Sequence, residues 1–166
     1  MNLSEWFQTQ LQASGDGFIW GVEQVPPERR GVQPPGPLGE WTAARHVFHM
    51  LYYEQTIALP SMRQWLGDPL PFVDGLDEEA AWDTRQSLES LIAQFRDIRA
   101  EQIALLPRFD EALWHETREA VWGPVTLRWV DTSLHPPSLH PPGKAPSPCR
   151  SPHSALPAAF LPAGRM

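Results

Sequence analysis

The sequence changes character at Asp131, and this break limits what the chain can fold into more than any other feature. Nine of the 19 prolines fall in residues 131–166, and no acidic residue follows Asp131. A helix cannot run through Pro136-Pro137 or Pro141-Pro142, because an internal proline removes a hydrogen bond and clashes with the preceding turn. We therefore predict a folded domain over residues 1–130 and a Pro-rich, disordered tail over residues 131–166.

Before the break, three segments repeat apolar residues at the three- and four-residue spacing of a helix. The predicted helices span residues 3–25, 43–66 and 78–106. Thr42 and Asp77 are expected as the N-caps of the second and third helices, because their side chains can accept a hydrogen bond from the first turn. Each helix ends at a proline or a glycine, which are common terminators.

The start of a fourth helix is predicted at residues 125–130, after a short helical turn near Asp110. Gly123-Pro124 is interpreted as a loop followed by a proline at the first helical position. No segment shows the sustained alternation of a strand. The sequence thus predicts an all-α fold, an antiparallel four-helix bundle whose fourth helix is incomplete.

Composition excludes several classes of function. The net charge is -7 and the pI is about 5.3, so a nucleic-acid partner is not expected. No stretch approaches the roughly 20 apolar residues needed to span a bilayer, and the N-terminus does not resemble a signal peptide. Cys149 is the only cysteine, so an intrachain disulfide is impossible, and we expect a cytoplasmic protein.

The second predicted helix carries the residues on which a functional prediction can rest. His46, His49 and Tyr53 lie on or near one face of it. The run from Gly39 to Met50, with Glu54 beyond it, resembles the DinB/YfiT-like superfamily. In that pattern a tryptophan and a small hydroxyl residue open the helix, and a histidine stands eight positions after the tryptophan. His49 matches this histidine.

Further support comes from residues 95–99, Phe-Arg-Asp-Ile-Arg, which are similar to the third helix of the superfamily. The resemblance covers about residues 1–130. It implies a four-helix bundle with a divalent metal, often zinc or nickel, held by one histidine of the second helix and two histidines four apart on the fourth. It also implies a hydrolase or a thiol-dependent transferase or isomerase, acting on a small molecule with a low-molecular-weight thiol as a partner.

Carried onto this sequence, the resemblance makes His49 a candidate metal ligand. His46, Tyr53 and Glu54 are candidate pocket residues, and no catalytic residue is assigned. The alternative for His49 is a hydrogen-bonded histidine of the core, and His46 is expected to be a partly exposed helix residue.

The second and third metal ligands have no match in the sequence. His135 and His140 are five apart with two prolines between them, so they cannot share one helical face. Residues 133–150 can be back-translated into codons and the reading frame moved by one base. The shifted frame permits the pattern His-x-x-x-His, with the first histidine spanning the codons of residues 137 and 138 and the second those of residues 141 and 142. We hypothesise that the tail is a frameshift product.

Two alternatives follow from the same features. A bundle that lacks most of its fourth helix exposes the apolar stripes of the other three helices, so a non-catalytic protein that forms a homodimer or binds a partner is the second hypothesis. The Pro-rich tail could instead be a polyproline II recognition segment, since Ser-Leu-His-Pro-Pro occurs twice. An out-of-frame tail accounts better for the loss of acidic residues.

Overall fold

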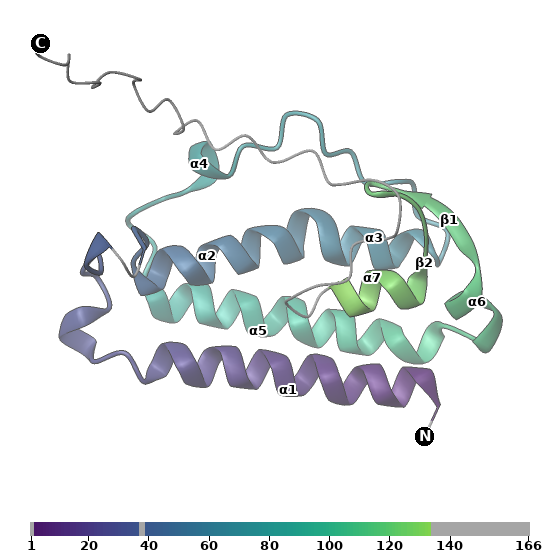
Figure 1. Ribbon diagram of the computed structural model, residues 1–166, viewed down its shortest axis with the longest axis horizontal. Coiled ribbons are helices and arrows are strands. Elements are labelled where there is room, and N and C mark those ends of the chain that lie inside the picture. Colours follow the sequence, from purple (N-terminus) through teal and green to yellow (C-terminus); the bar gives the residue numbers. More distant parts are fainter. Residues whose placement is uncertain (1, 37–38, 134–166) are drawn as a thin grey trace, which may run out of the picture.

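Three helical rods form the frame of the protein (Figure 1). The computed structural model describes residues 2–36 and 39–133. The first rod is α1 (Leu3–Glu23) and the second is α5 (Leu88–Leu105). The third is continuous and consists of α2 (Ala43–Tyr53), the π-helical turn η3 (Glu54–Ala58) and α3 (Leu59–Gln64). α5 lies between the other two rods and packs against both.

The starts of the three rods follow from their capping residues. Asn2 and Glu5 form a capping box at α1, and the Thr42 side chain accepts a hydrogen bond from Arg45 N at α2, as predicted. Ser87 accepts from Ser90 N at α5. After α1 the chain passes through a 3-10 turn, η1 (Pro27–Arg29), before it reaches α2.

α2 and α5 run in the same direction, whereas the antiparallel arrangement predicted from the sequence has them opposed. Their first turns line one hollow, and their far ends meet in one buried cluster that contains Trp65 and Leu106. The connection over residues 65–87 therefore runs back along the length of α2 (Figure 1). Parallel neighbours in a bundle require such a crossover connection.

The prediction that the third helix begins after Asp77 is wrong. Asp77 caps a separate short helix, α4 (Glu78–Ala81), which ends where Trp82 takes an extended conformation. The rod α5 begins ten residues later than predicted, at Leu88. The first turn after Asp77 is helical, but it belongs to the crossover and packs on α2.

A small β-hairpin replaces the predicted loop and helix start at Gly123-Pro124. The chain continues from α5 through η4 (Leu106–Arg108) and α6 (Glu111–His115) into β1 (Thr117–Ala120) and β2 (Gly123–Thr126). The strands pair antiparallel, with Thr117 opposite Thr126 and Ala120 opposite Gly123. Gly123 has a φ of 90°, which favours glycine. Four-residue strands are too short to show alternation, and an edge strand tolerates Pro124.

The last described element is α7 (Leu127–Ser133), which runs opposite to α2 and α5 (Figure 1). Leu127 and Val130 are fully buried against residues of α1 and α3, together with η4. A helix therefore begins close to where the sequence predicts the fourth one. The predicted disordered tail lies outside the described residues, apart from its first three positions.

The core consists of two apolar clusters along the rods. The first surrounds Phe7, Met62 and Trp114, and α7 contributes to it. The second lies toward the first turns of α2 and α5 and is built around Val47, Leu91 and Phe95, from α2 and α5, with Ile19 from α1. Within the part of the chain that the structure describes, no helix is both long and apolar enough to cross a membrane.

Replacing Leu127 by alanine tests whether α7 belongs to the core. Because Leu127 is fully buried, we expect Leu127→Ala to lower the free energy of unfolding by about 2–5 kcal/mol. The matched control is Arg128→Ala on the exposed side of α7, with an expected change below about 0.5 kcal/mol. Urea unfolding followed by far-ultraviolet circular dichroism measures both. Equal effects of the two substitutions would contradict this packing.

Candidate functional site

His49 lies on the surface of α2 beneath α4, and its imidazole is 45% exposed. Its Nδ1 is 2.8 Å from Oε2 of Glu78, and its ring is 5.0 Å from the ring of Trp41. Because a carboxylate only accepts hydrogen bonds, this contact places a proton on Nδ1. In the neutral ring Nε2 is then the nitrogen with a lone pair for a metal.

His46 lies one turn before His49 and is exposed. Its ring also packs against Trp41, with 5.4 Å between the two ring centroids. Both histidines therefore contact one tryptophan, and this part of α2 presents imidazoles at the surface rather than in the core.

The described residues do not complete a metal site around His49. Within the described part of the chain, Glu78 is the one other side chain that places an oxygen within hydrogen-bond distance of the His49 ring. Over residues 2–36 and 39–133 no group of three or more histidine, cysteine, aspartate or glutamate side chains could hold an ion. A stable divalent site needs three or four protein ligands, so His49 and Glu78 alone do not fit the metal that the resemblance implies. His135 and His140 lie outside the described residues.

Glu54, a candidate pocket residue, lies in the core between α5 and the α2 rod. The carboxylate is fully buried, and Nη2 of Arg99 donates a hydrogen bond to Oε1 over 2.7 Å. The Gln102 amide donates to the other carboxylate oxygen. Burial raises the pKa of Glu54, and Arg99 and Gln102 oppose that rise. The arrangement closes the carboxylate within a hydrogen-bonded cluster that joins two rods.

The π-helical turn η3 begins at Glu54. Such turns hold one more residue than the α-helix they interrupt and often mark functional sites. Here the turn lies directly after Tyr53, whose hydroxyl has a pKa raised to about 12, first by burial and then by Glu54. Tyr53 and Glu54 are thus neighbours with different surroundings, one partly buried and one fully buried.

Arg45 was not singled out from the sequence, yet it organises the polar surface next to His49. Its side chain is only 7% exposed, and its Nη2 lies 3.0 Å from Glu78 and 2.5 Å from Glu79 of α4. The guanidinium carbon is 5.3 Å from the ring centroids of three aromatic side chains. These are Trp41, Phe48 and Trp82. Arg45 therefore attaches the crossover to α2.

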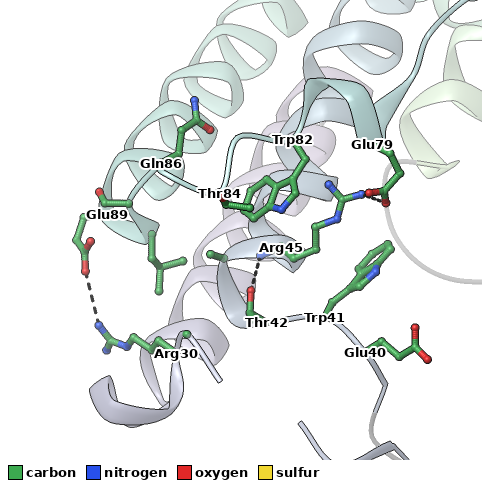
Figure 2. Close-up of a pocket in the computed structure, with 14 residues that line it drawn as sticks. Arg30, Glu40, Trp41, Thr42, Arg45, Glu79, Trp82, Thr84, Gln86 and Glu89 are labelled. Atoms are coloured by element: carbon green, nitrogen blue, oxygen red, sulfur yellow. Dashed lines mark hydrogen bonds and ion pairs between the residues drawn. The ribbon is translucent and has the colours of Figure 1, made fainter. Parts of the chain in front are cut away.

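A hollow of about 700 Å³ opens beside Arg45, between the first turns of α2 and α5 (Figure 2). Its wall combines Trp41 and Trp82 with two arginines, Arg30 and Arg45. The sequence gives no signal for it, because its sides come from three separate stretches of the chain, residues 30–31, 40–45 and 79–89.

A comparison with known protein families identifies the superfamily of this chain. A profile described as the DinB superfamily matches residues 10–130. The chain belongs to the DinB superfamily. No curated protein and no solved structure gives a significant match. The matched part of this DinB-superfamily chain includes His46, His49, Tyr53 and Glu54, and it ends one residue before the change in composition at Asp131.

The first test of this site concerns the buried ion pair. Removing one partner of such a pair costs about 3–5 kcal/mol, so Glu54→Leu should lower the free energy of unfolding by that amount. The double variant Glu54→Leu with Arg99→Met removes both charges, and we expect it to regain more than half of the loss. Urea unfolding of the single and double variants gives the coupling energy. Strictly additive effects would refute a direct coupling.

The second test uses the two tyrosines of the chain, Tyr52 and Tyr53. Tyr53 has a pKa of about 12 when folded, against 10.0 ordinarily, so the native state keeps a proton that the unfolded state loses between these values. Stability contributed by this group is complete below pH 10 and declines as the pH rises toward 12. Tyr53→Phe should remove that part of the decline. Tyrosinate absorbance, compared between the wild type and Tyr53→Phe, monitors ionisation of Tyr53, and its ionisation near pH 10 in the folded protein would refute the prediction.

Proposed function

We propose that this chain derives from a DinB-type metal-dependent enzyme, a hydrolase or a thiol-dependent transferase or isomerase, and that it is defective in the metal site. The observation that carries the proposal is the half-exposed imidazole of His49, which is hydrogen-bonded to Glu78. Among the described residues, no third side chain that could bind a metal lies beside this pair. His49 keeps the position of an ancestral ligand. It does not by itself hold zinc or nickel.

The partner that we propose is a small molecule, with a low-molecular-weight thiol as the co-substrate of the ancestral enzyme. The net charge of -7 argues against nucleic acid. A cytoplasmic location and an organisation into a domain over residues 1–130 and a tail over 131–166 are part of the same proposal.

A non-catalytic helical protein that acts through self-association or partner binding is the second candidate. The crossover favours it, because Phe72 is 79% exposed, and Leu70 and Leu76 are 46% and 40% exposed. Three large apolar side chains on one connection form a surface that a partner or a second copy could cover. A homodimer is the simplest assembly of this kind.

The decisive measurement is an isothermal calorimetric titration of the full chain with zinc and with nickel. We expect no stoichiometric binding tighter than about 10 µM, because one imidazole and one carboxylate make a weak site. His49→Ala should weaken any remaining binding further, because it removes the imidazole from this pair. The matched control is His115→Ala, an exposed histidine that contacts Glu111 on α6.

Tight binding of one ion per chain that is lost in His49→Ala, but not in His115→Ala, would overturn the proposed defect. Donors from residues 131–166 would then complete the site, and the enzyme hypothesis would gain. A midpoint of thermal unfolding that zinc raises in the wild type but not in His49→Ala would report the same outcome, because a ligand that binds the folded state stabilises it.

A further inference from the structure

The outward side of α1 is exposed to solvent. Figure 1 shows α1 as the outermost of the three rods, with α5 between it and the α2 rod. The buried side chains of α1 pack mainly against α5 and η4. The side turned away from them carries five exposed residues at spacings of three, four, four and three positions, which keep them on one face: Trp6, Thr9, Ala13, Gly17 and Trp20. We call this row the outer stripe of α1.

Two large aromatic side chains lie at the ends of the outer stripe. Trp20 is 65% exposed and Trp6 is 36% exposed, and they are about 21 Å apart along the helix axis. Scattered single apolar residues are common on protein surfaces, whereas these two share one helix face, and the stripe between them has no charged residue. Tryptophan is enriched where one protein contacts another. The outer stripe therefore has the composition of an interface.

Gly17 lies within the stripe, and the fold does not account for it. Among the described residues, apart from its own helix, no atom lies within 4 Å of where a Cβ at Gly17 would be. Gly15, by contrast, is buried against Arg99 of α5. A glycine inside a helix is destabilising relative to alanine, and it is useful where another backbone must approach closely. Gly17 therefore indicates a contact from outside the chain.

The spacing of the outer stripe is the same from either end, with Ala13 at its centre. Two antiparallel copies of α1 can therefore be related by a twofold axis at Ala13, so that each copy presents the same surface to the other. Trp6 of one copy then lies beside Trp20 of the other, and Thr9 lies beside Gly17. Small residues at the centre let the two helices approach, while the tryptophans cover each other at both ends.

The charges on α1 fit the same arrangement. α1 has no basic residue, and its three acidic residues are Glu5, Asp16 and Glu23. In the register centred on Ala13, each of them lies level with an uncharged residue of the other copy: Gly21, Gln10 and Leu3. Glu23, which comes nearest to Glu5 of the other copy, is paired with Arg96 of α5. Antiparallel helices also oppose their dipoles. A helix without lysine or arginine is poorly suited to an anionic membrane surface.

We propose that the outer stripe of α1 binds a second copy of this chain, in an antiparallel α1 pair with its twofold axis at Ala13. This interface goes beyond the proposed function, because α5 separates α1 from the rod that carries His49. It therefore does not depend on whether His49 binds a metal, and it lies apart from the exposed side chains of the crossover.

The area of the stripe sets the strength of the dimer. The exposed parts of Trp6 and Trp20 together amount to about one whole tryptophan per copy, so two copies cover roughly 400 Å² of aromatic surface. Specific interfaces cover about 1,200 Å² or more in total, and the rest must come from the six or so turns of helix around the tryptophans. A dissociation constant of about 1–100 µM is therefore expected.

Sedimentation velocity of the full chain over about 1–500 µM measures this equilibrium. Ala13→Arg places two like charges face to face at the twofold axis, so it should weaken the dimer at least about tenfold. Ala93→Arg is the matched control, because Ala93 is exposed on α5 and lies off the stripe. Its dissociation constant should stay within about twofold of the wild type. Circular dichroism shows whether each variant is folded.

Cysteine cross-linking tests the direction of the pair without weakening it. In a Cys149→Ser background, mild oxidation should cross-link Ala13→Cys with itself, since a disulfide needs Cα atoms within about 7 Å. Thr9→Cys should cross-link only when it is mixed with Gly17→Cys. A parallel pair would instead cross-link Thr9→Cys with itself. Ala93→Cys is the control for random collisions.

Three results would overturn the proposal. A chain that stays monomeric over the whole concentration range would leave the outer stripe to a different partner. A dimer that Ala13→Arg leaves intact would place the interface elsewhere, for example on the crossover. Cross-linking of Thr9→Cys by itself, above the level of Ala93→Cys, would exclude the antiparallel arrangement. None of these results bears on the metal titration, so the two proposals fail separately.

Discussion

The buried ion pair between Glu54 and Arg99 is the constraint around which the three rods are arranged. A carboxylate in the core is tolerable only when charged or polar groups surround it, and here Arg99 and Gln102 bond to its two oxygens. Both partners come from α5, so the pair fixes the position of the α2 rod along α5. α1 passes the same point at Gly15, where an added Cβ would lie 3.6 Å from Cγ of Arg99. All three rods therefore meet at one charge pair.

Arg45 performs a similar task at the surface. A connection that must return along a whole helix has few apolar contacts of its own, and Leu70 and Phe72 in it remain exposed. The connection is attached where α4 meets α2, through Glu78 and Glu79 on the Arg45 guanidinium and through Trp82, which packs on Phe48. The same contacts place Glu78 beside His49. The surroundings of the candidate ligand are therefore set by how the crossover is attached.

The sequence predicts what depends on neighbouring residues and fails where distant segments meet. Apolar periodicity and cap residues predicted the rods, and Thr42 is the N-cap as expected. Asp77 also caps a helix, but the apolar pattern continues through Trp82, so nothing local marked the break before Ser87. The parallel direction of α2 and α5 depends on the long connection between them, whose sequence has no helical or strand periodicity. The motif around Trp41 predicted His49 as a candidate ligand, a role that stays a prediction, whereas Arg45 joins segments more than thirty positions apart.

The π-helical turn has a consequence for how sequences of this family should be compared. An α-helix advances by about 100° per residue, so one extra residue in η3 rotates everything after it by that angle relative to everything before it. His49 precedes the turn and Met62 follows it. A helical wheel drawn from the sequence as one regular α-helix would therefore place one of these two residues on the wrong face of the helix. A relative with a regular α-helix here would be one residue shorter inside the helix. A single-residue gap between Tyr53 and Leu59 should then be read as a real difference in structure.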